Sequence, residues 1–362
     1  EVARHENITI HTCAEVESVE GEVGNFHVRV KKHPRYILED ECNGCGDCTR
    51  ICPVEVYNQF DAGIGVRKAI YKPHAQAVPD IVVKDQEHCI ECGLCYDVCG
   101  RGAILHEDKE RLIEIEAASI VVATGYKTFD ARNKAQLRYL AVPDVITSLE
   151  FERMICASGP TGGKLKRLSN GKPPRSIAFV QCVGSRDISV GRPYCSGVCC
   201  MYAMKNAMLI REKNPDIEVT VFYNDIRAYG KGYEEYYERA RSLGVRFVRG
   251  FPGEVLVAND HLMMTAENTE TSEVETFHPD LVVLSVGLEP AGGAEEIARM
   301  LGIPRDESGF FGVADQKVGP VLTVKPGIYV AGAATAPQDI PDSVTMGGAA
   351  AMRAYLDAIR AG

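Results

Sequence analysis

The cysteines carry the clearest chemical signal in the sequence, because eight of its 14 stand in two runs of one pattern. Each run reads C-x2-C-x2-C-x3-C and is followed by Pro53 in the first run and by Gly100 in the second. This spacing is typical of proteins with two 4Fe-4S clusters, where the fourth cysteine of each run ligates the other cluster. The alternative is a pair of zinc sites, since C-x2-C is also a zinc spacing. We predict one cluster on Cys42, Cys45, Cys48 and Cys99, and a second on Cys89, Cys92, Cys95 and Cys52.

Four further cysteines have the different spacing C-x12-C-x3-C-C. Cys182 ends a predicted strand, while Cys195, Cys199 and Cys200 lead into the helix that follows. Open parallel sheets bind ligands at the carboxyl ends of their strands, and thiolates suit soft metals. We therefore predict a third 4Fe-4S cluster here. Zinc, a redox disulfide and buried free thiols are the alternatives.

A parallel sheet must position this second set of cysteines. Residues 176–180, 218–223 and 245–249 are predicted strands, and residues 199–212 and 232–243 are predicted helices between them. This alternation is typical of a doubly wound α/β unit. The remaining predicted elements are strands at 8–13, 26–31, 113–115, 119–125, 281–286 and 327–333, a hairpin of 255–266 with 273–277, and a final helix at 343–360.

Composition limits the partners and the compartment. The chain has 50 acidic and 40 basic residues, a net charge of −10, which argues against nucleic acid or anionic membranes as partners. Its apolar runs, such as residues 281–286, fall short of the ~18 residues of a membrane-spanning helix. Cysteines at ligand spacing and the lack of an opening signal segment predict a reducing cytoplasm. Cys13 and Cys156 are solitary and are assigned no role.

Three apolar runs resemble strands of the pyridine nucleotide–disulfide oxidoreductases. SIVVATG at 119–125 resembles the strand that closes their FAD domain, and LVVLSVGLEP at 281–290 the matching strand of their second domain. GIYVAGA at 327–333, followed by a long helix, resembles the return to the FAD domain, where the start of the helix faces the flavin. This resemblance assigns Thr124, Gly125, Tyr126, Gly332, Ala333, Asp342, Ser343 and Val344 to the flavin site.

The nucleotide fingerprints of those enzymes are missing. No G-x-G-x-x-G follows a predicted strand, so we expect the ADP-binding half of the FAD site to come from a partner polypeptide or an upstream segment. Residues 181–186 read QCVGSR, with one glycine where a nicotinamide domain needs several, so we predict no NAD site. The C-x4-C redox pair of an NAD-dependent disulfide reductase is missing as well.

Taken together, these motifs resemble the A-type subunits of heterodisulfide reductase over essentially the whole chain. The resemblance is carried by QCVGSRD at 181–187 and YCSGVCCMYAMKNA at 194–207, together with the cysteine runs. ITSLEFER at 146–153, ASGPTGG at 157–163, RAYGKGYEE at 227–235 and DIPDSV at 339–344 add to it. The N-terminal region of that family and the C-terminal ferredoxin module of many members are not in this sequence.

The resemblance implies a flavin and iron–sulfur subunit that takes part in flavin-based electron bifurcation. It implies FAD, ferredoxin-type clusters, an unusual 4Fe-4S cluster beside the flavin, and Lys205 as a catalytic residue near the flavin N5 atom. The implied partners are B- and C-type heterodisulfide reductase subunits, a hydrogenase or formate dehydrogenase, and ferredoxin in a multimeric complex. The alternative is a relay subunit that carries clusters but no flavin of its own.

These features predict an α/β fold: a thioredoxin-reductase-like two-domain flavoprotein with an inserted bacterial-type ferredoxin module of the α+β class. The FAD domain is predicted in three pieces, and the NAD-like domain carries the third cluster. The predicted boundaries are 1–35 and 107–157 for the first two FAD-domain pieces, 36–106 for the ferredoxin module, 158–309 for the NAD-like domain, and 310–362 for the FAD-domain return and final helix.

Overall fold

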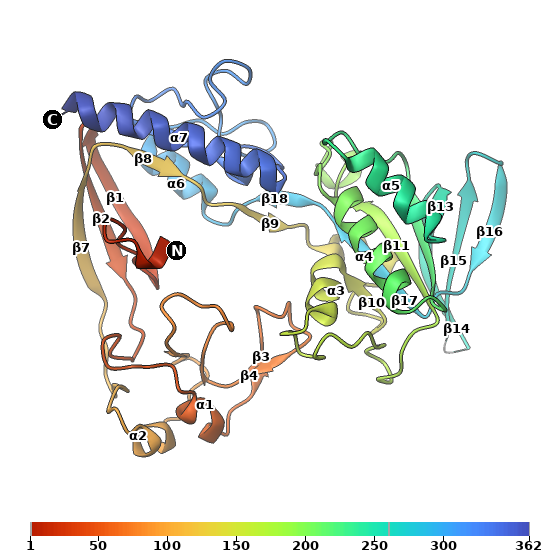
Figure 1. The fold of residues 1–362 in the computed structure, drawn as a ribbon, viewed down its shortest axis with the longest axis horizontal. Helices are drawn as coiled ribbons and strands as arrows, with labels where there is room; N and C mark the ends of the chain where they lie inside the picture. The colour runs from red at the N-terminus through yellow and green to blue at the C-terminus, as the bar shows by residue number, and fades with distance from the viewer. Residues whose placement is uncertain (1, 260, 362) are drawn as a thin grey trace. The chain divides into compact units, whose positions relative to one another are not determined.

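The computed structural model describes residues 2–259 and 261–361, and these form two compact units (Figure 1). The eight cysteines of the two runs lie in the first unit, and the C-x12-C-x3-C-C set lies in the second. The first unit holds the described residues up to Gly21 with Asn25–Ala117 and Cys156–Gly163; the second holds Glu22–Gly24, Ala118–Ile155 and the described residues from Lys164 onward.

A three-stranded antiparallel sheet in the order β1-β2-β7 forms one part of the first unit. Its strands are β1 (Ala14–Glu22), β2 (Asn25–Lys32) and β7 (Arg111–Ala117). The strand predicted at 8–13 is wrong, because those residues form no strand and the sheet takes β1 instead. Four glutamates interrupt the apolar pattern of β1, so this segment contains no apolar run that would predict a strand.

The cysteine runs fold as two similar turns, each closed by a short helix. Helix α1 (Asp47–Ile51) follows Gly46, and α2 (Leu94–Val98) follows Gly93; both glycines have the left-handed φ angles, 82° and 78°, that suit glycine. The fourth cysteine of each run ends its helix in an extended conformation. Two hairpins join the runs: β3 (Val56–Tyr57) with β4 (Val66–Arg67), and β5 (Ile70–Tyr71) with β6 (Val83–Lys84).

One carboxylate ties the entry of this cysteine-rich module to its exit. Asp108 Oδ2 accepts hydrogen bonds from the backbone N–H groups of Arg35, at 2.8 Å, and Tyr36, at 2.9 Å. The Asp108 side chain is only 7% exposed. Burial alone would raise the pKa of Asp108, but the hydrogen bonds from these donors outweigh burial. The pKa of Asp108 therefore lies below its usual value.

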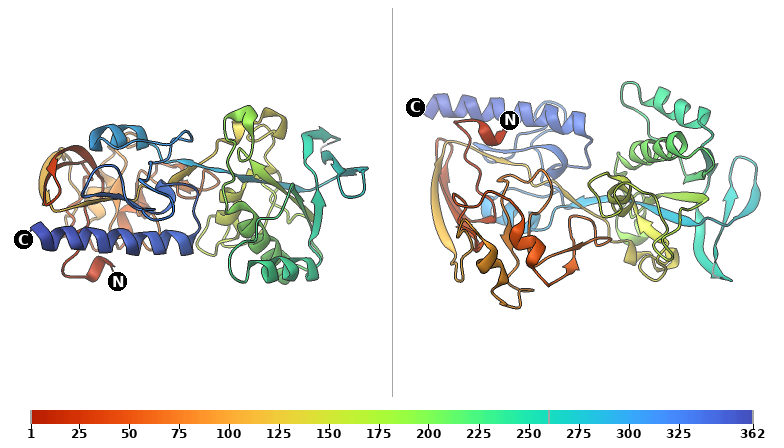
Figure 2. Two further views of the ribbon diagram at one scale, coloured as in Figure 1. Left: turned by 90° about the horizontal axis from the view of Figure 1, so that it is seen from above. Right: turned by 60° about the horizontal axis from the view of Figure 1, so that its bottom comes forward.

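The second unit is built on a five-stranded parallel sheet in the order β10-β17-β11-β12-β13. Helix α4 (Cys199–Lys213) connects β11 to β12, and α5 (Tyr233–Ser242) connects β12 to β13, which confirms the predicted doubly wound arrangement. The two helices lie side by side in Figures 1 and 2. The strands are β10 (Val145–Thr147), β11 (Ser176–Val183), β12 (Glu218–Tyr223), β13 (Arg246–Arg249) and β17 (Leu281–Val286).

The sheet is buried on both faces. On one face, Phe179 of β11 meets Phe151 of α3 (Ser148–Ile155) edge to face, with ring centroids 5.5 Å apart. On the other face, side chains such as Val180 and Phe222 form a core with Met264. That second layer is an antiparallel sheet of β14 (Pro252–Ala258), β15 (His261–Asn268) and β16 (Glu273–Phe277).

The hairpin predicted from residues 255–266 and 273–277 is wrong in one respect. The first segment is two strands, because the chain reverses after β14 and β15 pairs with β14 as well as with β16. Asn259 has φ 50°, a left-handed conformation that asparagine tolerates better than most residues. An apolar pattern that continues on both sides of the reversal hid it in the sequence.

The rest of the second unit consists of two small sheets and two helices. Strands β8 (Ile120–Val122) and β19 (Ile328–Val330) pair in parallel, and β9 (Tyr126–Thr128) pairs with β18 (Leu288–Pro290). Helix α6 spans Ala294–Leu301, and the long α7 spans Ile340–Ala361. The 3-10 helices are η1 (Val2–Arg4), η2 (Ala131–Asn133), η3 (Ala135–Leu137), η4 (Ile188–Val190) and η5 (Gly332–Ala334).

The structure confirms the predicted α/β class and places the cysteine-rich module between β2 and β7 of the first unit. Among residues 2–259 and 261–361, no helix combines the length and the apolar character that a membrane crossing requires.

Replacing Asp108 by asparagine should destabilise the cysteine-rich module. Hydrogen bonds to a charged group contribute about 1.5–3 kcal/mol, and the amide is a weaker acceptor for the N–H groups of Arg35 and Tyr36. Because the folded pKa is lowered, this stabilisation is present at neutral pH and is lost as the pH falls below about 4. Unfolding of the full protein followed by circular dichroism against pH measures both effects.

Asp40→Asn is the matched control, because Asp40 is exposed and this substitution removes the same charge from the same unit. Equal unfolding midpoints for Asp108→Asn and the wild type at neutral pH would show that this clamp does not hold the module.

Candidate functional site

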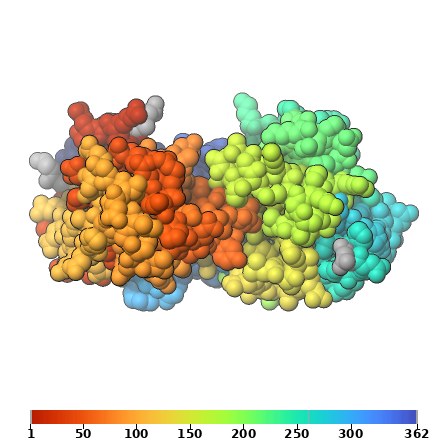
Figure 3. Space-filling model, turned by 90° about the horizontal axis from the view of Figure 1, so that it is seen from below, coloured from red at the N-terminus to blue at the C-terminus, as the bar shows by residue number. Residues whose placement is uncertain are grey.

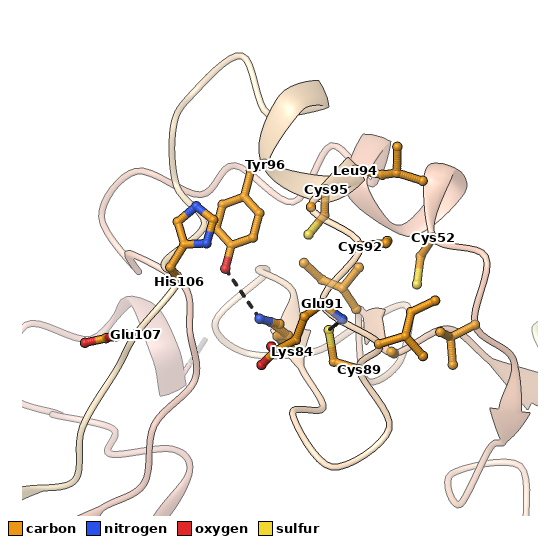
Figure 4. A pocket seen from close by; sticks show the side chains of 15 residues that line it. Cys52, Lys84, Cys89, Glu91, Cys92, Leu94, Cys95, Tyr96, His106 and Glu107 are labelled. Carbon is orange, nitrogen blue, oxygen red and sulfur yellow. Dashed lines mark hydrogen bonds between the residues drawn. The ribbon is translucent and has the colours of Figure 1, made fainter.

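Four cysteines from both runs line one cavity of about 330 Å³ in the first unit, here called the Cys52 cavity (Figure 4). Three come from the second run, and Cys52 crosses over from the first run. The sulfur atoms of Cys52, Cys89 and Cys95 turn toward the same space in Figure 4. The structure thus brings together the set Cys52, Cys89, Cys92 and Cys95 that the exchanged fourth cysteines predict.

The second predicted set lines a separate cavity in the same unit, here called the Cys99 cavity. Cys99 crosses over from the second run to meet Cys42, Cys45 and Cys48 of the first. Cys45 and Cys92, the second cysteine of each run, are exposed. The segment around α2, drawn in orange, lies at the surface of the first unit in Figure 3.

Burial governs the acidity of the inner cysteines. Desolvation, with smaller contributions from the charges of Cys42 and Cys45, raises the pKa of Cys48 to about 11. Burial also raises the pKa of Cys95. A thiolate in such surroundings needs a bound cation, and four soft sulfur donors around one space suit an iron–sulfur cluster or zinc. The donor set of both cavities therefore fits the predicted clusters.

The third group of cysteines, here called the Cys182 quartet, comes together at the carboxyl end of β11. Cys182 has φ 56° at a bulge in β11, and Cys199 and Cys200 open α4. Cys199 hydrogen-bonds with both Cys182 and Cys200. Burial raises the pKa of Cys195, and this residue lies close enough for the charges of Cys182 and Cys200 to raise it as well. The structure therefore gathers all four predicted residues at one place.

The quartet shares protons unevenly. The pKa of Cys199 is raised well above its usual value by its hydrogen bonds to Cys182 and Cys200 and by burial. The hydrogen bond from Cys199 lowers the pKa of Cys200 to about 7, against the opposing effect of burial. Cys182 is lowered in pKa for the same reason. Four sulfur donors gathered at one place suit an iron–sulfur cluster, in which each thiolate binds its own iron.

A buried serine pair holds the loop of the quartet against the sheet. Ser196 N donates to Ser185 Oγ at 2.9 Å, and Leu288 N donates to Ser196 Oγ at 2.9 Å. Both serines are fully buried. Gly184 and Gly287 allow the backbones to meet here, because a Cβ on Gly287 would lie 2.5 Å from the carbonyl oxygen of Gly184. This contact fixes the loops on which Cys182 and Cys195 lie.

A pocket of about 560 Å³, here called the Tyr202 pocket, lies directly beside the quartet in the second unit. Gly197 and Val198, which precede Cys199, line it together with Tyr202 of the same helix. Its apolar walls and tyrosine edges suit a planar aromatic ligand such as a flavin ring. Of the residues predicted for the flavin, the lining contains Tyr126, Ala333, Ser343 and Val344.

Other residues predicted for the flavin do not line this pocket. These are Thr124, Gly125, Gly332, Asp342 and Lys205. Gly332 lies just behind it, since a Cβ there would be 3.4 Å from Ser343 Oγ.

The start of α7 also differs from the sequence prediction. The helix begins at Ile340 and not at residue 343, because Asp339 caps it: Asp339 Oδ1 accepts from Asp342 N at 2.9 Å. Ser343 N donates to the carbonyl oxygen of Asp339 at 3.0 Å, so this amide already has a partner. Asp339 also accepts a hydrogen bond from Tyr233 at 3.1 Å.

Lys205 has a partner that sequence reasoning missed. Its Nζ donates to both carboxylate oxygens of Glu152, at 2.5 and 2.6 Å, and Asn206 donates to the same group at 3.0 Å. Both charged side chains are about one-third exposed, at 38% and 32%. The ITSLEFER motif contains Glu152, but no spacing rule relates α3 to α4. Cys13 and Cys156 lie outside all three cysteine groups.

Comparison with known proteins places these features in context. Residues 41–104 match the family model of the 4Fe-4S dicluster domain. The A-type subunit of the H2:CoB-CoM heterodisulfide,ferredoxin reductase of Methanothermobacter thermautotrophicus is 48% identical over 362 residues, which cover 99% of this chain and 55% of that protein. The second A-type iron-sulfur subunit of the CoB–CoM heterodisulfide reductase of Methanopyrus kandleri is 51% identical, with coverages of 98% and 54%.

The chain therefore spans about half the length of the curated relatives it matches. Among solved structures, thioredoxin reductase of Lactococcus lactis is similar at 18% identity and a TM-score of 0.44, over 81% of this chain and 86% of that one.

Replacing Gly287 by alanine should disturb the Cys182 quartet. The added methyl group would press on the carbonyl oxygen of Gly184 and lie 2.9 Å from Ser196 Oγ. Overpacking of this kind costs about 1–3 kcal/mol, and it pushes apart the two loops that bring Cys182 and Cys195 together. We expect a lower thermal unfolding midpoint and a lower iron content in the purified protein.

Gly253→Ala serves as the control, because a Cβ at Gly253 meets no atom within 4 Å. If Gly287→Ala keeps both the iron content and the unfolding midpoint of the wild type, the close approach is not what positions the quartet.

Proposed function

Because the chain belongs, over the length it covers, to the family of A-type heterodisulfide reductase subunits, we propose that it is a flavin and iron–sulfur electron-transfer protein of such a complex. One observation carries this proposal: twelve cysteines converge on three separate places, two in the first unit and one in the second. Each place offers four sulfur donors, which suits three 4Fe-4S clusters. The protein is then an oxidoreductase that moves electrons, and its flavin would exchange them with clusters and not with a nicotinamide.

The position of the quartet supports a flavin in the Tyr202 pocket. Clusters pass single electrons, and a flavin exchanges electrons singly or in pairs. Residues 197 and 198 line the pocket and lie next to Cys199 in the chain, so the loop of the quartet is also a wall of the pocket. Tyr202 lies on the same wall, and burial with the nearby Cys199 raises its pKa well above its usual value. Its hydroxyl therefore stays neutral.

The names of the relatives support a role in electron bifurcation. Curated relatives are named for H2, for formate and for ferredoxin as well as for the CoB–CoM heterodisulfide. We infer that this chain helps to divide electron pairs from a hydrogenase or formate dehydrogenase between a disulfide-reducing branch and low-potential ferredoxin. Its partners in that complex would be B- and C-type heterodisulfide reductase subunits.

The flavin site requires residues outside this chain. Helix α7 exposes Val344, Met352, Tyr355 and Ile359, and the parallel pair β8-β19 has no further strand in the described part of the chain. Exposed apolar side chains and open strand edges are typical of a surface that another segment covers. A βαβ unit placed there would supply the glycine turn that binds the ADP half of FAD.

A relay protein without a flavin remains the second candidate. Thr124, Gly125 and Lys205 do not line the Tyr202 pocket. The carboxylate of Asp339, which caps the start of α7, does line it. The visible spectrum of the purified complex separates the two proposals, because a bound flavin absorbs in a characteristic way and can be released and quantified.

Cys199→Ala should lose one of three clusters and keep the other two. The alanine removes the residue that interacts with both Cys182 and Cys200, while the eight cysteines of the two runs in the first unit are unchanged. Iron and sulfide analysis, with electron paramagnetic resonance (EPR) of the reduced protein, measures the change against Cys13→Ala as the control. Zinc in place of iron in the wild type, or an unchanged iron content in Cys199→Ala, would contradict the proposal.

Lys205→Ala should shift the flavin potential to more negative values and leave the iron content unchanged. Lys205 does not line the Tyr202 pocket, but the family resemblance implies that it lies near the flavin N5 atom, where a cation would stabilise the reduced, anionic form; the alanine removes that charge. Glu152→Gln should act in the opposite direction, because Lys205 loses the carboxylate that neutralises it. A spectroscopic redox titration measures both. Lys213→Ala, at the exposed end of α4, is the control, and equal potentials in all four proteins would exclude the role of Lys205.

A further inference from the structure

Lys84 is a buried cation that none of the roles above explains. Its side chain lies in strand β6 of the first unit, and the residue is only 5% exposed. No ion pair links it to a carboxylate among residues 2–259 and 261–361. Its Nζ donates to Tyr96 Oη at 3.4 Å and lies over the rings of Tyr36 and Tyr96, at 5.1 and 5.6 Å.

The neighbouring charges do not compensate Lys84. Asp85 follows it in the chain but accepts from Arg67 at 2.7 Å. Tyr96 Oη accepts from Lys84 and donates to the carbonyl oxygen of Leu105 at 2.5 Å, so it is a hydrogen-bond partner of Lys84 and not a counter-ion. Burying an ammonium group without a counter-ion is costly, and proteins rarely retain one without a partner. The protein therefore needs an anion close to Lys84.

The Cys52 cavity lies beside this ammonium, because Lys84 is one of the residues that line it (Figure 4). Cys95 and Lys84 line the same cavity, so the ammonium group and this sulfur donor share one space. Glu91 and Glu107 line the same cavity, but both are exposed, so water and salt screen their charges.

The first run has an apolar residue in the matching place. Ile37 precedes Cys42 by as many positions as Lys84 precedes Cys89, and Ile37 is buried as well, at 3% exposure. The charged residues that line the Cys99 cavity are Asp47 and Arg101, and they pair with Arg50 and Glu41. The two cavities therefore have the same sulfur donors but differ by one buried positive charge.

We propose that Lys84 is the counter-ion of the cluster in the Cys52 cavity and makes it the easier of the two to reduce. The inference rests on the proposed function, since it requires a cluster in each cavity. A cluster with four thiolate ligands is anionic, and its reduction adds one more negative charge. A nearby cation stabilises the reduced form more than the oxidised form, and low polarity around it strengthens the effect.

This charge difference gives the two cavities an order. An electron shared between them would rest in the Cys52 cavity, and the Cys99 cavity would hold the more strongly reducing cluster. The difference in buried charge comes from a single side chain, because the other charged residues that line the two cavities are exposed or paired with a neighbour.

A redox titration of the complete protein, followed by EPR under anaerobic conditions, tests the inference. Lys84→Met keeps an unbranched side chain of similar length and removes the charge. We expect one of the two ferredoxin-type signals to shift to a more negative midpoint potential and the other to stay. Lys84→Arg keeps the charge and should retain the wild-type midpoint. Lys109→Met makes the same charge change at an exposed position of the first unit and should leave both midpoints unchanged.

The outcomes separate this inference from the proposed function. A wild type without the two signals overturns the proposed function itself. Two signals with unaltered midpoints in Lys84→Met, at full iron content, overturn only the role of Lys84, as does an equal shift in Lys84→Arg. If Lys84→Met loses iron while Lys84→Arg keeps it, the counter-ion role is supported. Loss of iron in both variants would assign Lys84 a purely steric role and overturn the inference.

Discussion

Buried sulfur atoms that must share one cation are the constraint on which the rest of this structure depends. Thiolates repel one another, and burial opposes their ionisation, as the raised pKa of Cys48 and of Cys95 shows. Such groups come together only if the backbone holds them there and a cation compensates them. The fold provides the first condition, and the iron of the proposed clusters would provide the second.

The two units meet this constraint by different means. In the first unit, left-handed glycines turn the chain sharply before each short helix, and Asp108 ties the ends of the module together. In the second unit, a packed parallel sheet supplies a rigid edge, and the buried Ser185–Ser196 pair fastens the quartet's loop to it. A glycine fingerprint for a nucleotide would occupy the same βα turn, so the quartet and a nicotinamide exclude each other there.

Much of this could be predicted from the sequence, because the signals are local. The cysteine spacings predicted which four residues line each cavity, and the apolar runs predicted the strands and helices of the parallel sheet. The failures have physical causes. Strand β1 was hidden by its glutamates, and the reversal at Asn259 was missed because apolar residues stand on both sides of it. The pairing of Lys205 with Glu152 and of Lys84 with Tyr96 depends on contacts between distant elements. No spacing within one element reveals such contacts.

The connection between the quartet and the Tyr202 pocket follows from helix geometry. Cys199 opens α4, and Tyr202 lies on the next turn of the same helix, so side chains three positions apart face one way. The hydroxyl of Tyr202 donates to the carbonyl oxygen of Val286 at 3.2 Å and accepts from Ser148 at 3.2 Å, which fixes the ring between α4 and the sheet. A ligand in the pocket would meet a wall that is continuous, through one turn of helix, with the sulfur atoms of the quartet. Rigid packing of this kind would hold such a ligand at a constant distance from the quartet.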